Sequence, residues 1–448
     1  MVNSSNGISV APKSLPLLGH TASLLRDPLG FIGSLPESGD LVQIRLGPFG
    51  MIMVCDPELA RTVLRDDRTF DKGGLMYDHV RELLRDSVAS CPHAVHRRQR
   101  RLVQPAFRPD RFPIYAETMI SCIAEVTNAW RDGQTIDVLT EMMTITLRVT
   151  TETLFSGKLP TPLLKMFIED VTTFHDSFHL YAFLPAPLDR LPSRGNRAYQ
   201  RAKTRLRETV DQIIAERHRE PTDRGDLLSA LLAARDPETD GNGLTDAEIS
   251  DTILAFFIAG TKTTATTLAW ALHLLTKYPS IEKRLHSEID AVITDGKVRY
   301  EDLPRLELTK RVFTEALRLY PPAWLSTRIV TCETELGEHL LPAGTTIAFS
   351  PYLLHHRGDL YDNPESFDPD RWDTSRSQPP ANAFIAFSGG ARKCVGDSFA
   401  TTEATLALAH IASHWRLEES PGDPVRPILG LVLRPRKLQM KVLSRTRP

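Results

Sequence analysis

One cysteine lies in a glycine-rich loop just ahead of a long helical pattern. The segment Phe387-Ser-Gly-Gly-Ala-Arg-Lys-Cys394-Val-Gly396 lets the backbone take positive φ and approach a ligand closely. The helix expected over residues 396–413 places its N-terminus beside the sulfur, which favours the thiolate. A buried structural thiol is the alternative for a lone cysteine. Zinc sites and hydrolase nucleophiles need partners at particular spacings, and Cys394 has none.

Two threonines follow a small-residue pair in the apolar middle of the longest helical pattern, residues 246–276. The order is Ala259-Gly260-Thr261-Lys262-Thr263-Thr264. Glycine relaxes the helical ladder, and threonine hydroxyls hydrogen-bond to helix carbonyls. The pattern predicts a notch that admits a small molecule. A Thr-rich helix that simply packs is the alternative.

Helices must position both segments, because helical periodicity dominates from about Pro57 onward. Further helices are predicted over 115–130, 137–154, 196–217, 281–292 and 309–320. Residues 41–46 and 51–55, joined through Gly47–Gly50, form a predicted hairpin, and strands return near 345–349 and 437–442. We expect one domain over residues 1–448, mainly α with a small β region and no fused reductase.

Composition excludes several classes of protein. The 448 residues carry a formal net charge of -2, so no basic excess recruits nucleic acid. Five scattered cysteines form no disulfide framework. The chain starts without a signal-peptide pattern and contains no apolar run long enough to span a bilayer. A cytoplasmic monomer is expected.

The cysteine loop resembles the haem-binding signature F-x-x-G-x-R-x-C-x-G of the cytochrome P-450 family. Its five specified positions are Phe387, Gly390, Arg392, Cys394 and Gly396. The likeness extends to E-x-x-R at Glu315 and Arg318 and to P-E-R-F around Arg371, which together imply a structural triad. It implies haem b, with Cys394 as the iron ligand, between a long distal helix and the proximal helix after the cysteine loop.

The resemblance also assigns the distal helix and the propionate partners. The family signature [A/G]-G-x-[D/E]-T-[S/T] is matched by Ala259, Gly260, Thr263 and Thr264. The match implies that O₂ binds beside this segment and that Thr263 stabilises the bound oxygen during proton delivery. Lys262 departs from the family, which has an acid there, so its ammonium either meets a partner from another helix or reaches solvent. The implied propionate partners are His96, Arg100, Arg328 and Arg392.

The substrate implied by the resemblance is a lipophilic small molecule. The implied walls are apolar and show no fixed charge, although each such residue is alternatively core. They comprise Leu75, Met76, Tyr77, Phe256, Ala259, Ala323, Trp324, Leu325, Leu431 and Val432, with Phe174, Phe178 and Phe183 as a roof. The pattern is similar to bacterial terpene-oxidising members, which implies a sesquiterpene hydrocarbon such as pentalenene, oxidised successively at an allylic methyl in secondary-metabolite biosynthesis.

Electrons are expected from a separate ferredoxin and ferredoxin reductase. Arg97, Arg98, Arg101 and Lys393 form a predicted basic docking patch for an acidic ferredoxin. Three functions remain open: a monooxygenase of a terpenoid, steroid or fatty acid, a peroxide-using or non-oxygenating haem-thiolate enzyme, and a haem-binding sensor.

Overall fold

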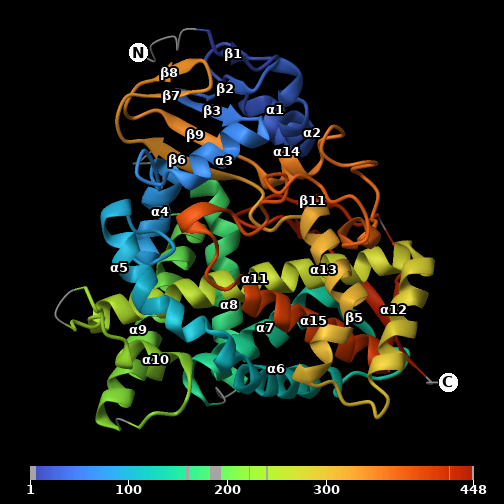
Figure 1. Ribbon diagram of the computed structural model, residues 1–448. Coiled ribbons are helices and arrows are strands. Elements are labelled where there is room, and N and C mark those ends of the chain that lie inside the picture. The colour runs from blue at the N-terminus through green and yellow to red at the C-terminus, as the bar shows by residue number, and fades with distance from the viewer. Residues whose placement is uncertain are drawn as a thin grey trace.

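Helices form most of the molecule, and a sheet covers one end (Figure 1). The computed structural model describes residues 7–157, 161–181, 193–220, 222–238, 241–422 and 424–445. The mainly α prediction with a small β region is confirmed. The longer helices are α4 (Leu75–Leu84), α5 (His93–Val103), α6 (Phe112–Thr127), α7 (Val138–Phe155), α8 (Thr161–Tyr181), α9 (Arg194–Arg219), α11 (Asp246–Lys277), α12 (Pro279–Val292), α13 (Glu307–Leu319) and α15 (Asp397–His414). The shorter ones are α1 (Thr21–Arg26), α2 (Pro28–Gly33), α3 (Pro57–Arg65), α10 (Leu227–Ala233) and α14 (Pro351–His355).

The main sheet has the strand order β1-β2-β3-β9-β6-β4. The predicted hairpin is β2 against β3, with Leu46 paired to Phe49, and β3 runs parallel to β9 with Ile52 opposite Ile347. These strands are β1 (Ser9–Val10), β2 (Leu41–Leu46), β3 (Phe49–Val54), β4 (Phe70–Asp71), β6 (Ser326–Val330) and β9 (Thr346–Phe349). Smaller sheets pair β5 (Thr135–Asp137) and β10 (Trp415–Glu419) with β13 (Gln439–Ser444), β7 (Thr334–Leu336) with β8 (His339–Leu341), and β11 (Pro427–Ile428) with β12 (Arg434–Pro435).

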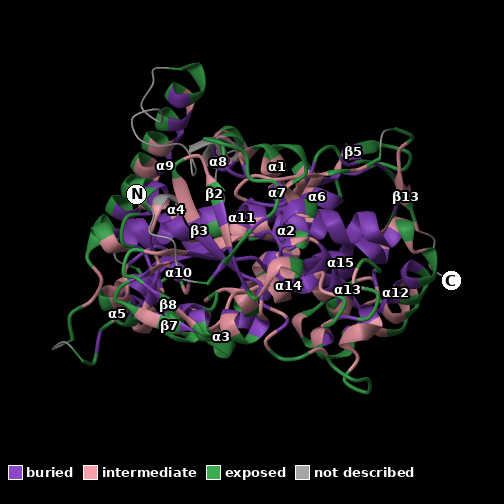
Figure 2. Ribbon diagram, turned by 90° about the horizontal axis from the view of Figure 1, so that it is seen from above, coloured by how far each residue is buried: buried purple, intermediate pink, exposed green. Residues whose placement is uncertain are grey.

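The helix α11 crosses the middle of the molecule (Figure 1), and the sequence defines both of its ends. Thr245 and Glu248 form a capping box at its start, which satisfies free N–H groups of the first turn. It ends at Lys277, two residues before Pro279, because proline disfavours helical geometry in the residue ahead of it. Most of its residues are buried, and Figure 2 shows α11 as a buried element with exposed segments around the periphery.

Two hydrophobic cores support the fold. The larger one joins α6, α7, α11, α13 and α15, and the smaller one lies under the main sheet. Tyr320 packs against both cores, and its ring stacks on Trp270 of α11 with centroids 3.8 Å apart.

Candidate active site

The cysteine loop is held by backbone contacts and by a neighbouring helix. The Cys394 N–H donates to the carbonyl of Phe387 at 2.9 Å. Gly390 has φ +62°, and a Cβ there would lie 2.1 Å from the carbonyl oxygen of Leu64, so glycine is required. From α5, Arg100 Nη1 donates to the carbonyl of Lys393 at 2.5 Å. These contacts fix the backbone on both sides of the sulfur.

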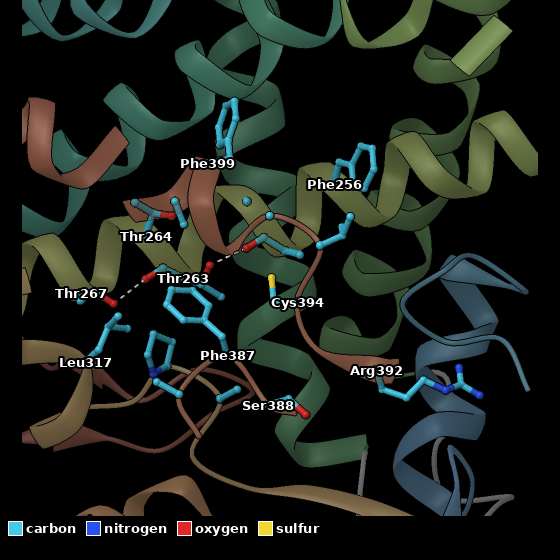
Figure 3. A pocket seen from close by; sticks show the side chains of 18 of the residues that line it. Phe256, Thr263, Thr264, Thr267, Leu317, Phe387, Ser388, Arg392, Cys394 and Phe399 are labelled. Carbon is cyan, nitrogen blue, oxygen red and sulfur yellow. Dashed lines mark hydrogen bonds between the residues drawn. The ribbon is translucent and has the colours of Figure 1, made fainter. Parts of the chain in front are cut away.

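The sulfur of Cys394 opens into a cavity of about 310 Å³. Figure 3 shows it facing the Thr263 segment of α11. Burial raises the pKa of the Cys394 thiol, although the Gly396 N–H and the charge of Arg100 act in the opposite direction. The neighbouring N–H and cations therefore do not offset the effect of burial on this thiol. Binding of a metal would favour loss of the proton, because a coordinating thiol is deprotonated.

The opposite wall of the cavity is the middle of α11, with Ala259, Gly260, Thr263 and Thr264 all contributing. Thr263 Oγ1 donates to the carbonyl of Ala259 at 2.5 Å, and Thr267 Oγ1 donates to that of Thr263 at 3.1 Å (Figure 3). A Cβ at residue 260 would lie 3.3 Å from Thr150 Oγ1 on α7. The absence of a side chain at Gly260 thus lets Thr150 of α7 approach α11, and both residues contribute to the lining of the cavity.

Lys262 lies away from this wall. It is only 2% exposed, and the described cavity lining does not include it. Successive helical residues point about 100° apart, so Thr263 faces the cavity while Lys262 faces the packed side of α11. Lys262 therefore does not contribute to the described cavity wall, and its side chain does not reach solvent.

Cationic side chains and hydroxyl groups lie together at one end of the cavity. Arg328 is 2% exposed and donates from Nη1 to the carbonyl of Thr327 at 2.8 Å and to Tyr77 Oη at 3.3 Å. Lys72 Nζ donates to the carbonyl of Ala89 at 2.5 Å and lies 5.7 Å from the centre of the Tyr77 ring. Burial lowers the pKa of Lys72, and the nearby cations Lys72 and Arg328 lower that of Tyr77 to about 8 against the effect of burial.

Arg392 borders the same end but already has two anionic partners. Its Nε donates to Asp67 at 2.7 Å and its Nη2 to Asp71 at 2.8 Å, while Nη1 donates to the carbonyl of Cys91. His96 lies behind this cluster, outside the cavity lining. Burial, together with the charges of Arg392 and Lys72, lowers the pKa of His96 to about 3, so its imidazole is neutral at pH 7.

The structure brings the predicted triad together. Glu315 binds Arg318 at 2.7 Å through Nη2 and at 2.9 Å through Nε, and Arg371 Nε reaches Glu315 at 3.4 Å. Trp372 Nε1 adds a bond at 2.8 Å, a member that sequence reasoning missed. Glu315 and Arg318 are fully buried.

Several predicted wall residues lie elsewhere. Tyr77, Phe256, Ala259 and Ala323 line the cavity, but Met76, Trp324, Leu325, Leu431, Val432 and Phe174 do not. Trp324 instead belongs to the smaller core and donates to the carbonyl of Gly430 at 2.9 Å. Phe174 stacks on Tyr199 with centroids 5.7 Å apart. The side chains of Leu75 and Phe178, and the whole of Phe183, lie outside the described part of the chain.

Sequence reasoning missed other parts of the wall, notably Lys72, Phe107, Thr150, Phe399 and Glu403. The last two carried a usable signal. Phe399 and Glu403 follow Cys394 at helical spacing on α15, where residues four apart share a face. The face that carries one residue toward the cysteine loop therefore carries the other.

The predicted basic docking patch is paired within the chain. Arg97 binds Glu238 at 3.2 Å, Arg98 binds Glu248 at 2.5 Å, and Lys393 binds Asp397 at 2.6 Å. Arg101 contacts both Asp236 and Glu238. These carboxylates offset the positive charge, so this group of side chains is not the strongly basic surface that was expected.

Among the residues that the structure describes, no helix has the length and hydropathy of a membrane span. The same part of the chain contains no cluster of His, Cys, Asp and Glu suited to a metal ion.

Comparison with known proteins gives a consistent result. The family model described as Cytochrome P-450 matches residues 11–442. The chain is 44% identical over 438 residues to pentalenene oxygenase of Streptomyces avermitilis, covering 97% of each chain. It is also 44% identical to cyclooctat-9-en-7-ol 5-monooxygenase of Streptomyces melanosporofaciens, covering 92% of this chain and 90% of the relative. The chain therefore belongs to the cytochrome P-450 family of haem-thiolate monooxygenases.

Proposed function

We propose that this protein hydroxylates a terpenoid hydrocarbon, with haem b bound through Cys394 and O₂ as the oxygen source. The observation that carries the proposal is the cavity between Cys394 and the Ala259–Thr264 segment of α11. In this cavity the proposed iron ligand, Cys394, faces the helix notch, and apolar side chains surround them. The best candidate substrate is a sesquiterpene such as pentalenene, oxidised successively at an allylic methyl.

The residues of the cavity fit a haem. A haem has an apolar macrocycle with two carboxylates at one edge, and the cavity has apolar walls with cations at one end. Arg328 and Lys72 are the best placed donors for the carboxylates, because Asp67 and Asp71 already partly satisfy Arg392. Phe387 and Gly396 line the cavity beside the sulfur. Charge-assisted bonds of this kind stabilise buried carboxylates.

His96 and Arg100 support the bound cofactor indirectly. Arg100 binds the carbonyl of Lys393, the residue before the proposed ligand, and thereby orients Cys394. His96 Nδ1 lies 4.0 Å from Asp67, which in turn holds Arg392. We propose that both residues position the cysteine loop and the arginine rather than bind propionate directly.

The threonines of α11 and the apolar walls are the parts of the cavity that would support oxygen chemistry. When bound, a haem-thiolate iron activates O₂ and delivers one oxygen atom to a C–H bond. Thr263 and Thr264 supply hydroxyl groups on the facing helix, and the bond from Thr263 to the Ala259 carbonyl fixes the orientation of the first. The apolar walls, among them Phe256 and Phe399, exclude water and orient the hydrocarbon.

The names of two relatives support the substrate class. One acts on pentalenene and another on a terpenoid alcohol. The second name favours an alternative substrate, an oxygenated terpenoid.

Turnover under ¹⁸O₂ with a ferredoxin and its reductase tests the proposal. We expect pentalenene to gain one labelled oxygen per round, detected by mass spectrometry, and to change the haem spectrum on binding. Product without label would indicate a non-oxygenating enzyme, and turnover with added peroxide alone would indicate a peroxide-using one. Binding without any product, for pentalenene and for terpenoid alcohols, would contradict the proposal and favour a sensor.

A further inference from the structure

Two buried carboxylates hold Arg392 without lining the cavity themselves. Arg392 Nε donates to Asp67 at 2.7 Å, and its Nη2 donates to Asp71, the last residue of β4, at 2.8 Å. Each acid is 8% exposed, and neither belongs to the described cavity lining, whereas Arg392 does. Arg392 lies two residues before Cys394, so the acids also hold the loop that carries the proposed iron ligand.

The two carboxylates are themselves fixed by contacts with other segments. Asp71 Oδ1 accepts from the Lys72 N–H at 2.7 Å, and its Oδ2 accepts from the His93 N–H at 2.8 Å. Asp67 Oδ1 lies 3.2 Å from His93 Nδ1. The strand β4 pairs with β6, which carries Arg328. The acids therefore connect the main sheet and the first turn of α5 to the cysteine loop.

The contacts of Arg392 leave it a donor for a ligand in the cavity. A guanidinium has five N–H groups. Two of them serve Asp67 and Asp71, and a third donates from Nη1 to the Cys91 carbonyl at 2.8 Å. The Cys91 sulfur, a weak acceptor, lies 4.0 Å from the same Nη1. The second N–H of Nη2 therefore remains for a bound carboxylate.

The acids also change the charge at this end of the cavity. Lys72, Arg328 and Arg392 all contribute to its described lining. Asp67 and Asp71 both bind the guanidinium of Arg392, and such a partner favours the ionised form of a carboxylate. Two anions beside one cation give this group a net negative charge. It offsets part of the positive charge that Lys72 and Arg328 bring.

We propose that Asp67 and Asp71 are positioning residues for the haem cofactor, which act through Arg392. They orient its free N–H toward the propionate end of the cavity and place negative charge beside that end. The inference rests on the proposed function. Hydrogen bonds and charge in the shell around a metal group set its affinity and its reduction potential. Because nearby anions favour the more positive ferric state, the pair slows haem release and lowers the ferric/ferrous midpoint potential.

Transfer of haem from the ferric protein to excess apomyoglobin tests the positioning. We expect release to be about tenfold faster in Asp67→Asn and in Asp71→Asn, the lower end of what loss of an outer-shell partner costs. The matched control is Asp170→Asn, because Asp170 is a buried acid of α8 that binds Arg205 at 2.9 Å outside the described lining. It should release haem at the wild-type rate. Wild-type release in both Asp67→Asn and Asp71→Asn would overturn the proposal.

Spectroelectrochemical titration tests the charge, which a purely structural role would not reveal. The midpoint potential should rise in Asp67→Asn and Asp71→Asn and stay unchanged in Asp170→Asn. Asp71→Glu retains the charge but alters the length of the side chain, so we expect faster haem release at a wild-type potential. Unchanged potentials in both asparagine variants would refute the electrostatic part. If those variants fail to fold, Asp71→Glu decides, and a wild-type release rate there would overturn the positioning.

Neither measurement requires a substrate or turnover. A protein that binds haem but oxidises no terpenoid would contradict the proposed function, while haem release and the midpoint potential would still report on Asp67 and Asp71. The two proposals therefore fail on different observations.

Discussion

Removal of the Glu315 side chain should destabilise the fold far more than a surface substitution. Glu315 accepts bonds from Arg318 Nε at 2.9 Å and Nη2 at 2.7 Å, and from Trp372 Nε1 at 2.8 Å. The backbone N–H of Asp368 adds a bond at 3.2 Å. In Glu315→Ala, the guanidinium of Arg318 stays buried without its carboxylate, so the change removes both charge compensation and several acceptors.

The size of the effect follows from these contacts. Breaking a buried ion pair by removing one partner costs about 3–5 kcal/mol. Arg318 keeps the carbonyls of His355, Pro364 and Ser366, and these acceptors place the loss within that range rather than above it. We therefore expect Glu315→Ala to lower the free energy of unfolding by about 4 kcal/mol.

Urea unfolding of the haem-loaded protein, followed by circular dichroism, measures this loss. The control is Glu220→Ala, since Glu220 pairs with Arg224 at 3.5 Å with both side chains exposed, and such pairs contribute about 0–1 kcal/mol. A loss below about 1 kcal/mol for Glu315→Ala would refute the conclusion that this carboxylate holds the segment after α14 against α13.

Three further outcomes are expected. Cys394→Ala should abolish the long-wavelength Soret band of the reduced carbon monoxide complex, and a normal thiolate-type spectrum in that variant would show that another group ligates the iron. Arg328→Ala should reduce haem content after purification more than His96→Ala does, because Arg328 lines the cavity and His96 does not; equal occupancy would place the propionates elsewhere. Lys262→Glu should lower the urea midpoint without raising product per NADPH, because the side chain is 2% exposed and faces away from the cavity, and improved coupling would contradict this placement.

Acid should destabilise the protein through His355, which burial keeps neutral. Its Nδ1 contacts the carbonyl of Arg318 at 3.1 Å and its Nε2 accepts from the Ile385 N–H at 3.1 Å. The pKa of His355 lies well below its ordinary value, so below about pH 6.5 the unfolded state binds a proton that the folded state does not. Stability then falls by up to about 1.4 kcal/mol per pH unit. The difference between the urea midpoints at pH 7 and pH 5 should be smaller in His355→Gln than in the wild type. An unchanged difference would show that other groups dominate the pH dependence of stability.

Sequence reasoning succeeded where one short segment contains the whole feature. The bounds of α11 and α15 follow from periodicity and end signals, and the glycine loop around Cys394 is contiguous with the helix that follows it. The pairing of Glu315 with Arg318 is an i,i+3 relation on one helix. In each case the residues that interact are also neighbours in sequence, so local rules suffice.

Sequence reasoning failed where the position of a side chain depends on contacts between segments that are distant in sequence. Trp324 and Ala323 are adjacent, yet only Ala323 lines the cavity, because the packing of the sheet decides which of the two turns inward. The basic residues of α5 were expected to be free for a partner, but Glu238 and Glu248 lie far away in sequence and pair with them. Periodicity identifies a charged face and does not identify what covers it.

Lys262 shows why a motif position and a function need separate arguments. The motif assigns a proton-bearing role to a position on α11, and in this chain that position carries a cation turned into packed protein. Proton supply is a property of the cavity, which requires an acidic hydrogen at its wall and a path to water but no particular helix. Lys262 is 2% exposed and lies outside the described lining of the cavity, so the residue at the motif position does not itself form the wall at which a proton would be supplied.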